Sequence, residues 1–426
     1  MHTAALVVGI VVGIGIVAFP PIVAASADNT WGLLGLWLAG GLISLLGALC
    51  YAELATARPH AGGEYHFLHQ AFGPRLAFLF AWARITVIQT GSIAVAAFIV
   101  GDHLSKVLWL GPFSAGIYAS LVVGGLTALN IAGTAPAKDA QTLFAATVVT
   151  GLALLAGLAL ATQSPAAASA GPALAPPGLA MIFVLLAYGG WNEAAYLSAE
   201  VRDPQRNILR SLVLALTVIT LLYLLVNLAF VRVLGLEGLR AESAPAVTLA
   251  QRLIGDAGGI VVALLVSLAA VSTVNGSILT GVRACYALGN DFTGLRLLGR
   301  WHGPRNAPVN ALLVQGLIAL ALVVFGTLTQ GGMQAMVEYT SPVFWFFLAL
   351  TALTLFRFRH RTASSPIYRV PGYPLVPLLF FAACLYMLHA SVVFTGAGAL
   401  LGVLMVLVGL PLYVWLQRRE RLAGQK

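Results

Sequence analysis

The chain has 426 residues, of which 60% are hydrophobic and only 9% are charged. A soluble domain carries roughly a quarter charged residues, so this composition excludes an ordinary water-soluble protein and indicates that lipid surrounds most of the chain. The 23 Lys and Arg against 14 Asp and Glu give a net charge of +9. These basic residues lie mainly in short loops between apolar stretches, which argues against a nucleic-acid partner.

Twelve apolar stretches are each long enough to cross a bilayer, which takes about 20 residues per helix. They are roughly 4–26, 31–57, 74–104, 113–133, 140–161, 179–199, 210–234, 256–288, 307–328, 335–356, 373–394 and 397–417. The first stretch lacks a preceding basic segment, so we interpret it as a membrane helix rather than a cleavable signal peptide. No linker is long enough for a soluble domain, and we expect one all-α membrane domain over residues 1–426.

Basic residues orient these spans, because loops that face the cytoplasm are rich in Lys and Arg. With the N-terminus inside, the outer loops hold Lys106, Arg240 and Arg252, whereas most other basic residues fall in inner loops and the C-terminal tail. We therefore expect a multi-pass protein of the cytoplasmic (inner) membrane, with both termini in the cytoplasm.

Glycine interrupts the first and sixth stretches. The first contains GIVVGIGI from Gly9, and the sixth contains YGGWNE from Tyr188. Unwound backbone at membrane depth is tolerated only where it lines a cavity or meets a ligand. The two stretches are five apart, which is the spacing that two inverted five-helix repeats require. Glycines that only permit close helix packing are the alternative, but packing does not explain the polar side chains of the sixth stretch.

Two opposed breaks favour a zwitterionic ligand. The N-terminus of a half-helix carries partial positive charge and free N–H groups, which suit a carboxylate. Exposed carbonyl groups at the opposing half-helix end suit an ammonium group. The pattern therefore indicates a site for a small molecule that carries both groups.

Four segments resemble the amino acid–polyamine–organocation superfamily, and within it the bacterial relatives of the L-type amino acid transporters. They are VVGIVVGIGIVAFP from Val7, GALCYAELATARPHAGGEYHFLHQAFGP from Gly47, FVLLAYGGWNEAAYLSAEVRDPQRNILRS from Phe183 and NGSILTGVRACYALGND from Asn275. The resemblance implies a leucine-transporter-like 5+5 inverted-repeat fold with discontinuous helices 1 and 6. Repeat one would cover about 4–161, repeat two about 179–356, and helices 11 and 12 about 373–417. It also implies a secondary active transporter, a symporter or exchanger, that moves amino acids by alternating access.

The resemblance also assigns the substrate contacts. The α-carboxylate would meet the backbone N–H groups of Gly13, Ile14 and Gly15, and the α-amino group would meet carbonyls around Val12 and near Tyr188. The complete set of substrate-binding candidates is Val12, Gly13, Ile14, Gly15, Ile16, Leu186, Tyr188, Gly189, Gly190 and Asn192. Ile14 is larger than the residue usual in the family, and Leu186 replaces a common gating Phe, so the pocket and outer gate differ from that pattern.

Ionisable residues inside the spans are candidates for ion coupling, because a charge at mid-membrane costs about 2.5–3.5 kcal/mol on insertion scales. Glu193 would pair with Arg84 in one state and be protonated in another. The alternative is a fixed structural pair of Arg84 with Glu193 or with Glu53. Sodium coupling would use the hydroxyl oxygens of Ser272 and Thr273, although such groups often bond to the i−4 carbonyl. The fifth span has no Lys of the kind that proton-coupled relatives carry, and an exchanger or uniporter needs no coupled ion.

Other chemistries have weaker support. We expect no cofactor and no metal site, because His60, His66 and His69 match no metal-ligand spacing, and we interpret them as interfacial side chains beside Arg58 and Glu64. An enzyme is disfavoured, since HExxH and GxSxG motifs are absent.

The expected partners are an amino acid, an optional proton or sodium ion, and the bilayer. We expect no acidic side chain in the substrate pocket. A polyamine or other organic-cation carrier of the same fold is the alternative, followed by a major-facilitator-type carrier.

Overall fold

The computed structural model describes residues 2–60, 62–162, 171–197, 204–329, 332–361, 368–394 and 397–423. Within these ranges the regular structure is helical, apart from one isolated bridge between His302 and Ala307. In chain order the elements are α1 (His2–Val11), α2 (Gly15–Ala18), α3 (Pro20–Ala24), α4 (Thr30–Ala57), α5 (Glu64–Phe72), α6 (Pro74–Ala83), η1 (Arg84–Ile88), α7 (Gln89–Val107), α8 (Ser114–Ala132), α9 (Thr134–Ala161), α10 (Pro177–Ala187), η2 (Trp191–Glu193), α11 (Ala194–Leu197), α12 (Pro204–Leu234), α13 (Leu236–Ala241), α14 (Pro245–Asp291), η4 (Thr293–Leu295), η5 (Gly303–Arg305), α15 (Val309–Leu328), α16 (Gly332–Arg361), α17 (Leu375–Phe394) and α18 (Ala397–Ala423).

In the described part of the chain, 11 helical segments are long and apolar enough to cross a membrane. They match eleven of the twelve predicted stretches. The predicted first span, 4–26, is not among them because it is divided into α1, α2 and α3, and none of these three is long enough alone. The predicted sixth span ends at 199, and residues 198 and 199 lie outside the described residues.

The surface of the bundle is apolar and its interior is partly polar, the reverse of a soluble protein. Leu121, Leu264 and Leu400 are 64%, 65% and 67% exposed, whereas Arg84 and Asn275 are almost completely buried. Such an exterior is suited to lipid. The chain is therefore an all-helical, multi-pass membrane protein.

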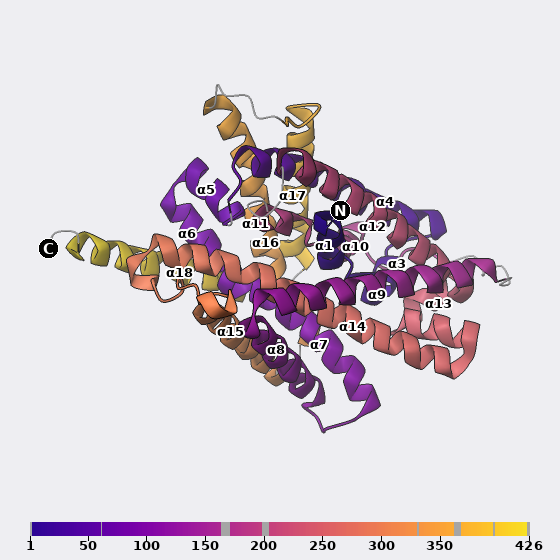
Figure 1. The fold of residues 1–426 in the computed structure, drawn as a ribbon. Coiled ribbons are helices and arrows are strands. Elements are labelled where there is room, and N and C mark those ends of the chain that lie inside the picture. The colour runs from indigo at the N-terminus through magenta and orange to yellow at the C-terminus, as the bar shows by residue number, and fades with distance from the viewer. Residues whose placement is uncertain are drawn as a thin grey trace.

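The two interrupted spans lie in the interior of this bundle (Figure 1). The half-helix α1 packs against α9, α12 and α14, while α10 packs against α4 and α17. The breaks also contact each other. A Cβ atom on Gly15 would lie 2.7 Å from the Cα of Ala187, and one on Gly190 would lie 2.9 Å from Cγ2 of Ile10. No side chain fits at Gly15 or Gly190. The two breaks can approach each other so closely because both positions are glycine.

Two further spans depart from regular α-helix. The third span changes to a π-helical turn at Arg84–Ile88 between α6 and α7, and such turns are frequent at functional sites. The long α14 contains a non-helical residue, Gly255, with φ 75°. The predicted eighth span, 256–288, is thus the part of α14 that follows this kink.

Candidate functional site

The first break leaves backbone donors without partners. α1 ends at Val11 and α2 begins at Gly15. The N–H of Ile14 donates to Oγ1 of Thr273 at 3.2 Å. Among the described residues, the N–H groups of Gly13 and Gly15 have no acceptor. Two of the three predicted carboxylate donors are therefore available, and the third is bound to a side chain of α14.

The second break leaves backbone acceptors without partners. α10 ends at Ala187, Gly190 adopts φ 108°, and a short 3-10 turn then begins at Trp191. Within the described residues, the carbonyl oxygens of Tyr188 and Gly189 accept no hydrogen bond. A positive φ of this size is readily adopted by Gly only, so the sequence permits this turn at Gly190 specifically.

A cavity of about 130 Å³ lies between the two breaks. A cavity of roughly 150 Å³ accepts a molecule the size of benzene, so this one is large enough for a small organic substrate. The predicted substrate-binding residues on its wall are Gly13, Ile14, Gly15, Leu186, Gly189, Gly190 and Asn192. The predicted residues that the wall does not include are Val12, Ile16 and Tyr188. The hydroxyl of Tyr188 donates instead to the carbonyl oxygen of Trp37 at 3.0 Å.

Several wall residues were missed by the sequence reasoning. They come mainly from the third, eighth and tenth spans, and they are Phe19, Gln89, Ser277, Thr280, Thr340, Ser341, Phe344 and Trp345. The run Thr340-Ser341-Pro342 was a usable signal, because a proline inside an apolar span frees backbone groups beside two hydroxyls. Ser92 of α7 also lines the wall.

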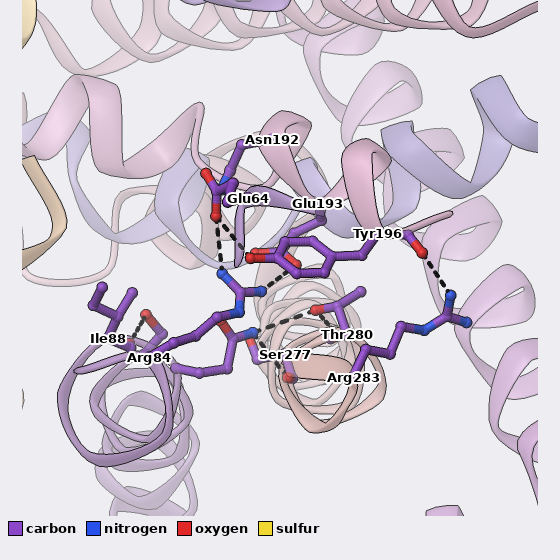
Figure 2. Close-up of polar contacts among 12 residues, drawn as sticks. Glu64, Arg84, Ile88, Asn192, Glu193, Tyr196, Ser277, Thr280 and Arg283 are labelled. Atoms are coloured by element: carbon purple, nitrogen blue, oxygen red, sulfur yellow. Dashed lines mark hydrogen bonds and ion pairs between the residues drawn. The ribbon is translucent and has the colours of Figure 1, made fainter. Parts of the chain in front are cut away.

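Of the coupling candidates, Glu193 and Thr273 line the cavity, whereas Arg84 and Ser272 lie behind its wall. Glu193 bears on two expectations. We expected a cavity wall without an acidic residue, and this expectation is wrong because Glu193 lines the cavity. The expected pair with Arg84 is present, since Nη2 of Arg84 donates to Oε2 of Glu193 at 2.6 Å (Figure 2).

A second carboxylate, which the sequence reasoning missed, also binds this guanidinium group. Nη1 of Arg84 lies 3.5 Å from Oε2 of Glu64. Glu64 begins α5 and is 3% exposed, so its carboxyl group is buried. Nothing in the local sequence distinguishes Glu64 from a loop carboxylate, because its partners come from residues far along the chain.

The alternative pair of Arg84 with Glu53 is also wrong. Glu53 accepts hydrogen bonds from Arg359 at 2.8 and 2.5 Å and from the backbone N–H of Val370 at 2.6 Å. It therefore ties the end of α4 to α16 and to the segment before α17. The structural role that we expected for Glu53 agrees with these contacts.

Both hydroxyl candidates for sodium coupling are connected to the first span, Ser272 through the side chain of Gln141 and Thr273 through the N–H of Ile14. Nε2 of Gln141 donates to the carbonyl oxygen of Gly9 at 2.8 Å and lies 3.0 Å from Oγ of Ser272. Thr273 accepts from Ile14 and donates to the carbonyl oxygen of Ala269 at 3.1 Å. Both hydroxyls thus have protein partners, and sodium ligation by them stays a prediction.

No cluster of three or more His, Cys, Asp or Glu side chains with metal-binding geometry occurs in the described ranges. The rings of His60 and His66 stack with centroids 4.1 Å apart. The Nδ1 atom of His60 accepts the N–H of Gly62 at 2.9 Å. These contacts give the pair a local structural role at the start of α5.

Interrupted helices that meet around a cavity with polar and apolar walls are typical of membrane transporters for small molecules. Residues 1–415 match the amino acid permease family, and the chain belongs to this family of the amino acid–polyamine–organocation superfamily. It is accordingly an amino acid transporter and not an enzyme.

Relatives over almost the whole chain agree with this assignment. The b(0,+)-type amino acid transporter 1 of Rattus norvegicus is 29% identical over 423 residues, which cover 96% of this chain and 85% of the relative. The human protein of that name is 28% identical over 402 residues, 91% of this chain and 81% of the relative. The large neutral amino acids transporter small subunit 2 of Mus musculus is 28% identical over 426 residues, 96% of this chain and 78% of the relative.

Proposed function

We propose that the protein is a secondary active transporter, a symporter or exchanger, that binds the α-amino and α-carboxylate groups of an amino acid between its two interrupted spans. One observation carries this proposal. The N–H groups of Gly13 and Gly15 and the carbonyl of Gly189 are free and belong to residues that line the same cavity, and the free carbonyl of Tyr188 belongs to the residue before Gly189. Leaving such groups buried and unpaired costs about 1–3 kcal/mol each, and a zwitterion would satisfy both sets.

We propose a five-plus-five inverted repeat, with spans 1–5 and 6–10 as its halves and spans 11 and 12 appended. Two features recur five spans apart. The breaks in the first and sixth spans correspond. A short helix follows the second span (α5) and another follows the seventh (α13). Alternating spans would put these two helices on opposite membrane faces, as inversion requires.

Alternating access is supported by a second cavity, of about 540 Å³. Val17 and Ala18 of α2 line this cavity, whereas Gly15 and Phe19 at the two ends of α2 line the smaller one. A four-residue helix thus contributes to the walls of both. We infer that movement of α2 connects them and opens the site to the outer face. The remaining assignments, a cytoplasmic membrane location and both termini inside, rest on the distribution of basic residues.

The substrates that this geometry favours are amino acids with neutral side chains. Apolar residues such as Ile182, Leu185 and Phe344 provide much of the wall. Glu193, the acidic residue of the wall among the described residues, is bound by Arg84. One of the relatives is named as a transporter of large neutral amino acids. A polyamine carrier is the second candidate, because the same carbonyls would also accept an amine.

The test is a panel of labelled amino acids in proteoliposomes, with uptake, counterflow and trans-stimulation measured under separate sodium and pH gradients. We expect saturable exchange of neutral amino acids that depends on substrate at the opposite face. Uptake of polyamines without any exchange of amino acids would contradict the proposal. Non-saturating flux would indicate a channel instead of a carrier.

A further inference from the structure

Three ionisable side chains from different elements form one buried cluster (Figure 2), and one of them, Glu193, belongs to a residue that lines the substrate cavity. Arg84 comes from the π-helical turn, Glu64 from α5 and Glu193 from η2. Their side chains are 1%, 4% and 8% exposed. If all three are ionised, the cluster carries two negative charges and one positive charge. A net charge in such surroundings is costly, because little solvent is present to stabilise it.

Glu64 is surrounded by hydrogen-bond donors. The hydroxyl of Tyr196 donates to its Oε2 at 2.9 Å, and Nδ2 of Asn192 lies 3.3 Å from its Oε1. The hydroxyl of Tyr51 also donates to Oε1. These donors favour the carboxylate, whereas burial, the largest cause, raises the pKa of Glu64. Glu64 accepts hydrogen bonds from these donors, and its carboxyl group competes with that of Glu193 for the guanidinium group of Arg84.

The carboxyl group of Glu193 has a different environment. In the described structure its side chain has a single hydrogen-bond partner, Nη2 of Arg84. It also lines the cavity, whereas Glu64 does not. Glu193 is therefore the acidic group of the cluster that can exchange a proton with water or substrate in the cavity.

The elements around the cluster bring one further cation. α11 contributes Tyr196, whose ring centroid lies 4.2 Å from Cζ of Arg84, and α4 contributes Tyr51. α14 contributes Arg283, but its Nη1 donates to the backbone carbonyl of Tyr196 at 2.8 Å and thus bonds to backbone on the far side of that ring (Figure 2). The neighbouring wall groups of α7 and α14, Gln89 and Thr280, are neutral. The excess negative charge beside Arg84 therefore has no second cation bound to it in the described residues.

We propose that Glu64 and Glu193 share one proton beside the guanidinium group of Arg84, and that this proton is carried with the amino acid during transport. Two carboxylates that compete for one cation cannot both ionise easily, and the pair then binds a proton jointly. The proton is taken from water at one membrane face, forms an O–H bond on one carboxylate, and returns to water at the other face. One positive charge thus moves with each substrate. The inference rests on the proposed transport function and names the groups that couple it.

The first experiment needs no substrate. The purified protein in lipid nanodiscs is titrated while infrared difference spectra record the C=O band of a protonated carboxylic acid. We expect one such band in the wild type at neutral pH and its loss in both Glu64→Gln and Glu193→Gln. In either variant the remaining carboxylate has Arg84 to itself and stays ionised. A band that is absent from the wild type, or that persists in either variant, overturns the proposal.

The second experiment measures coupling. Proteoliposomes with an imposed pH gradient are supplied with labelled L-leucine, and we expect accumulation by the wild type and its loss in both variants. Glu338→Gln is the matched control, because Glu338 contacts Gln334 near the start of α16, away from the cluster, and should keep both signals. Glu64→Gln leaves Arg84 paired with Glu193, so the two charges balance and this variant should fold. Its result alone can decide whether the two carboxylates share a proton. Absence of any amino acid exchange would contradict the transport function, whereas the infrared band tests the shared proton independently.

Discussion

At the scale of single residues, Gly190 combines two requirements that no other amino acid meets. Its φ of 108° lies in the left-handed region, and an added Cβ would lie 2.9 Å from Cγ2 of Ile10 and 3.3 Å from the carbonyl oxygen of that residue. The residue therefore permits the turn of the sixth span and its contact with the first. The neighbouring carbonyls of Tyr188 and Gly189 depend on the same turn for their direction.

We expect Gly190→Leu to abolish amino acid binding while the protein still inserts into the membrane, since the side chain would force the two breaks apart. Binding is measured by substrate-dependent thermal stabilisation of the purified protein, and insertion by its yield in the membrane fraction. Gly125→Leu is the control, because Gly125 in α8 has no atom within 4 Å of an added Cβ. Unchanged affinity in Gly190→Leu would refute the unwound binding site.

A substitution of Glu53 tests a residue for which we expect a structural role and no role in transport. Glu53→Gln keeps the size of the side chain but removes the charge that holds Arg359 and the N–H of Val370. Arg359 is partly exposed, so we expect a moderate loss of stability, about 1–3 kcal/mol. Thermal unfolding in detergent measures it, and the KM for substrate should stay within about twofold. A large change in KM with unchanged stability would instead connect Glu53 to transport.

At the scale of elements, the half-helix α1 is fastened to the bundle by side chains of its neighbours. Gln141 of α9 donates to Gly9, and the hydroxyl of Tyr223 of α12 donates to the carbonyl oxygen of Val11 at 3.1 Å. The same hydroxyl lies 2.9 Å from the carbonyl oxygen of Ala187, the last residue of α10. These neutral groups hold the ends of both half-helices where a membrane otherwise offers no partner.

We expect Gln141→Leu to lower the rate of amino acid exchange at least about tenfold, because it leaves the carbonyl of Gly9 and the hydroxyl of Ser272 unpaired at roughly 1–3 kcal/mol each. Exchange in proteoliposomes measures this effect. Gln315→Leu is the matched control, since Gln315 is equally buried but donates to Ile278 of α14 rather than to α1. An equal loss in both variants would show general destabilisation instead of a specific role for Gln141.

The elements also show where sequence reasoning succeeds and where it stops. Glycines inside apolar runs predicted both breaks, and in the sixth span polar side chains accompany them. Gln141 and Glu64 carried no comparable signal. Their partners, Gly9 and Arg84 among them, are distant in the sequence, and only the packing of α1, α9 and η1 brings them together.

At the scale of the whole molecule, the apolar exterior and the succession of spans were predictable from composition and loop charge. The count differed by one because a span that is broken in the middle is not a single helix. The second cavity beside α2 was not predictable, since its lining residues come from several elements that are distant in the sequence. Its residues, such as Asp102 and Met333, come from loops and helix ends of both proposed repeats.

The proposed repeats, breaks and cavity together make a prediction about substrate chemistry. The N–H groups of Gly13 and Gly15 require a carboxylate, and the carbonyls of Tyr188 and Gly189 require an ammonium group, so a substrate should need both. A ligand that lacks either group would leave buried groups of the protein unpaired. This loss costs about 1–3 kcal/mol, which corresponds to roughly tenfold to a hundredfold weaker affinity.

The measurement is a competition series against labelled L-leucine in proteoliposomes, in which each unlabelled amino acid is compared with its decarboxylated amine and its deaminated acid. We expect both analogues to compete at least about tenfold less well than the parent amino acid. The acid analogue serves as the control for the carbonyl half of the site, and the amine for the N–H half. Equal competition by the amine would favour the polyamine-type alternative. The assignment of the substrate carboxylate to the N-terminus of α2 would then be wrong. Equal competition by the acid would remove the ammonium site at Tyr188 while leaving the first break intact.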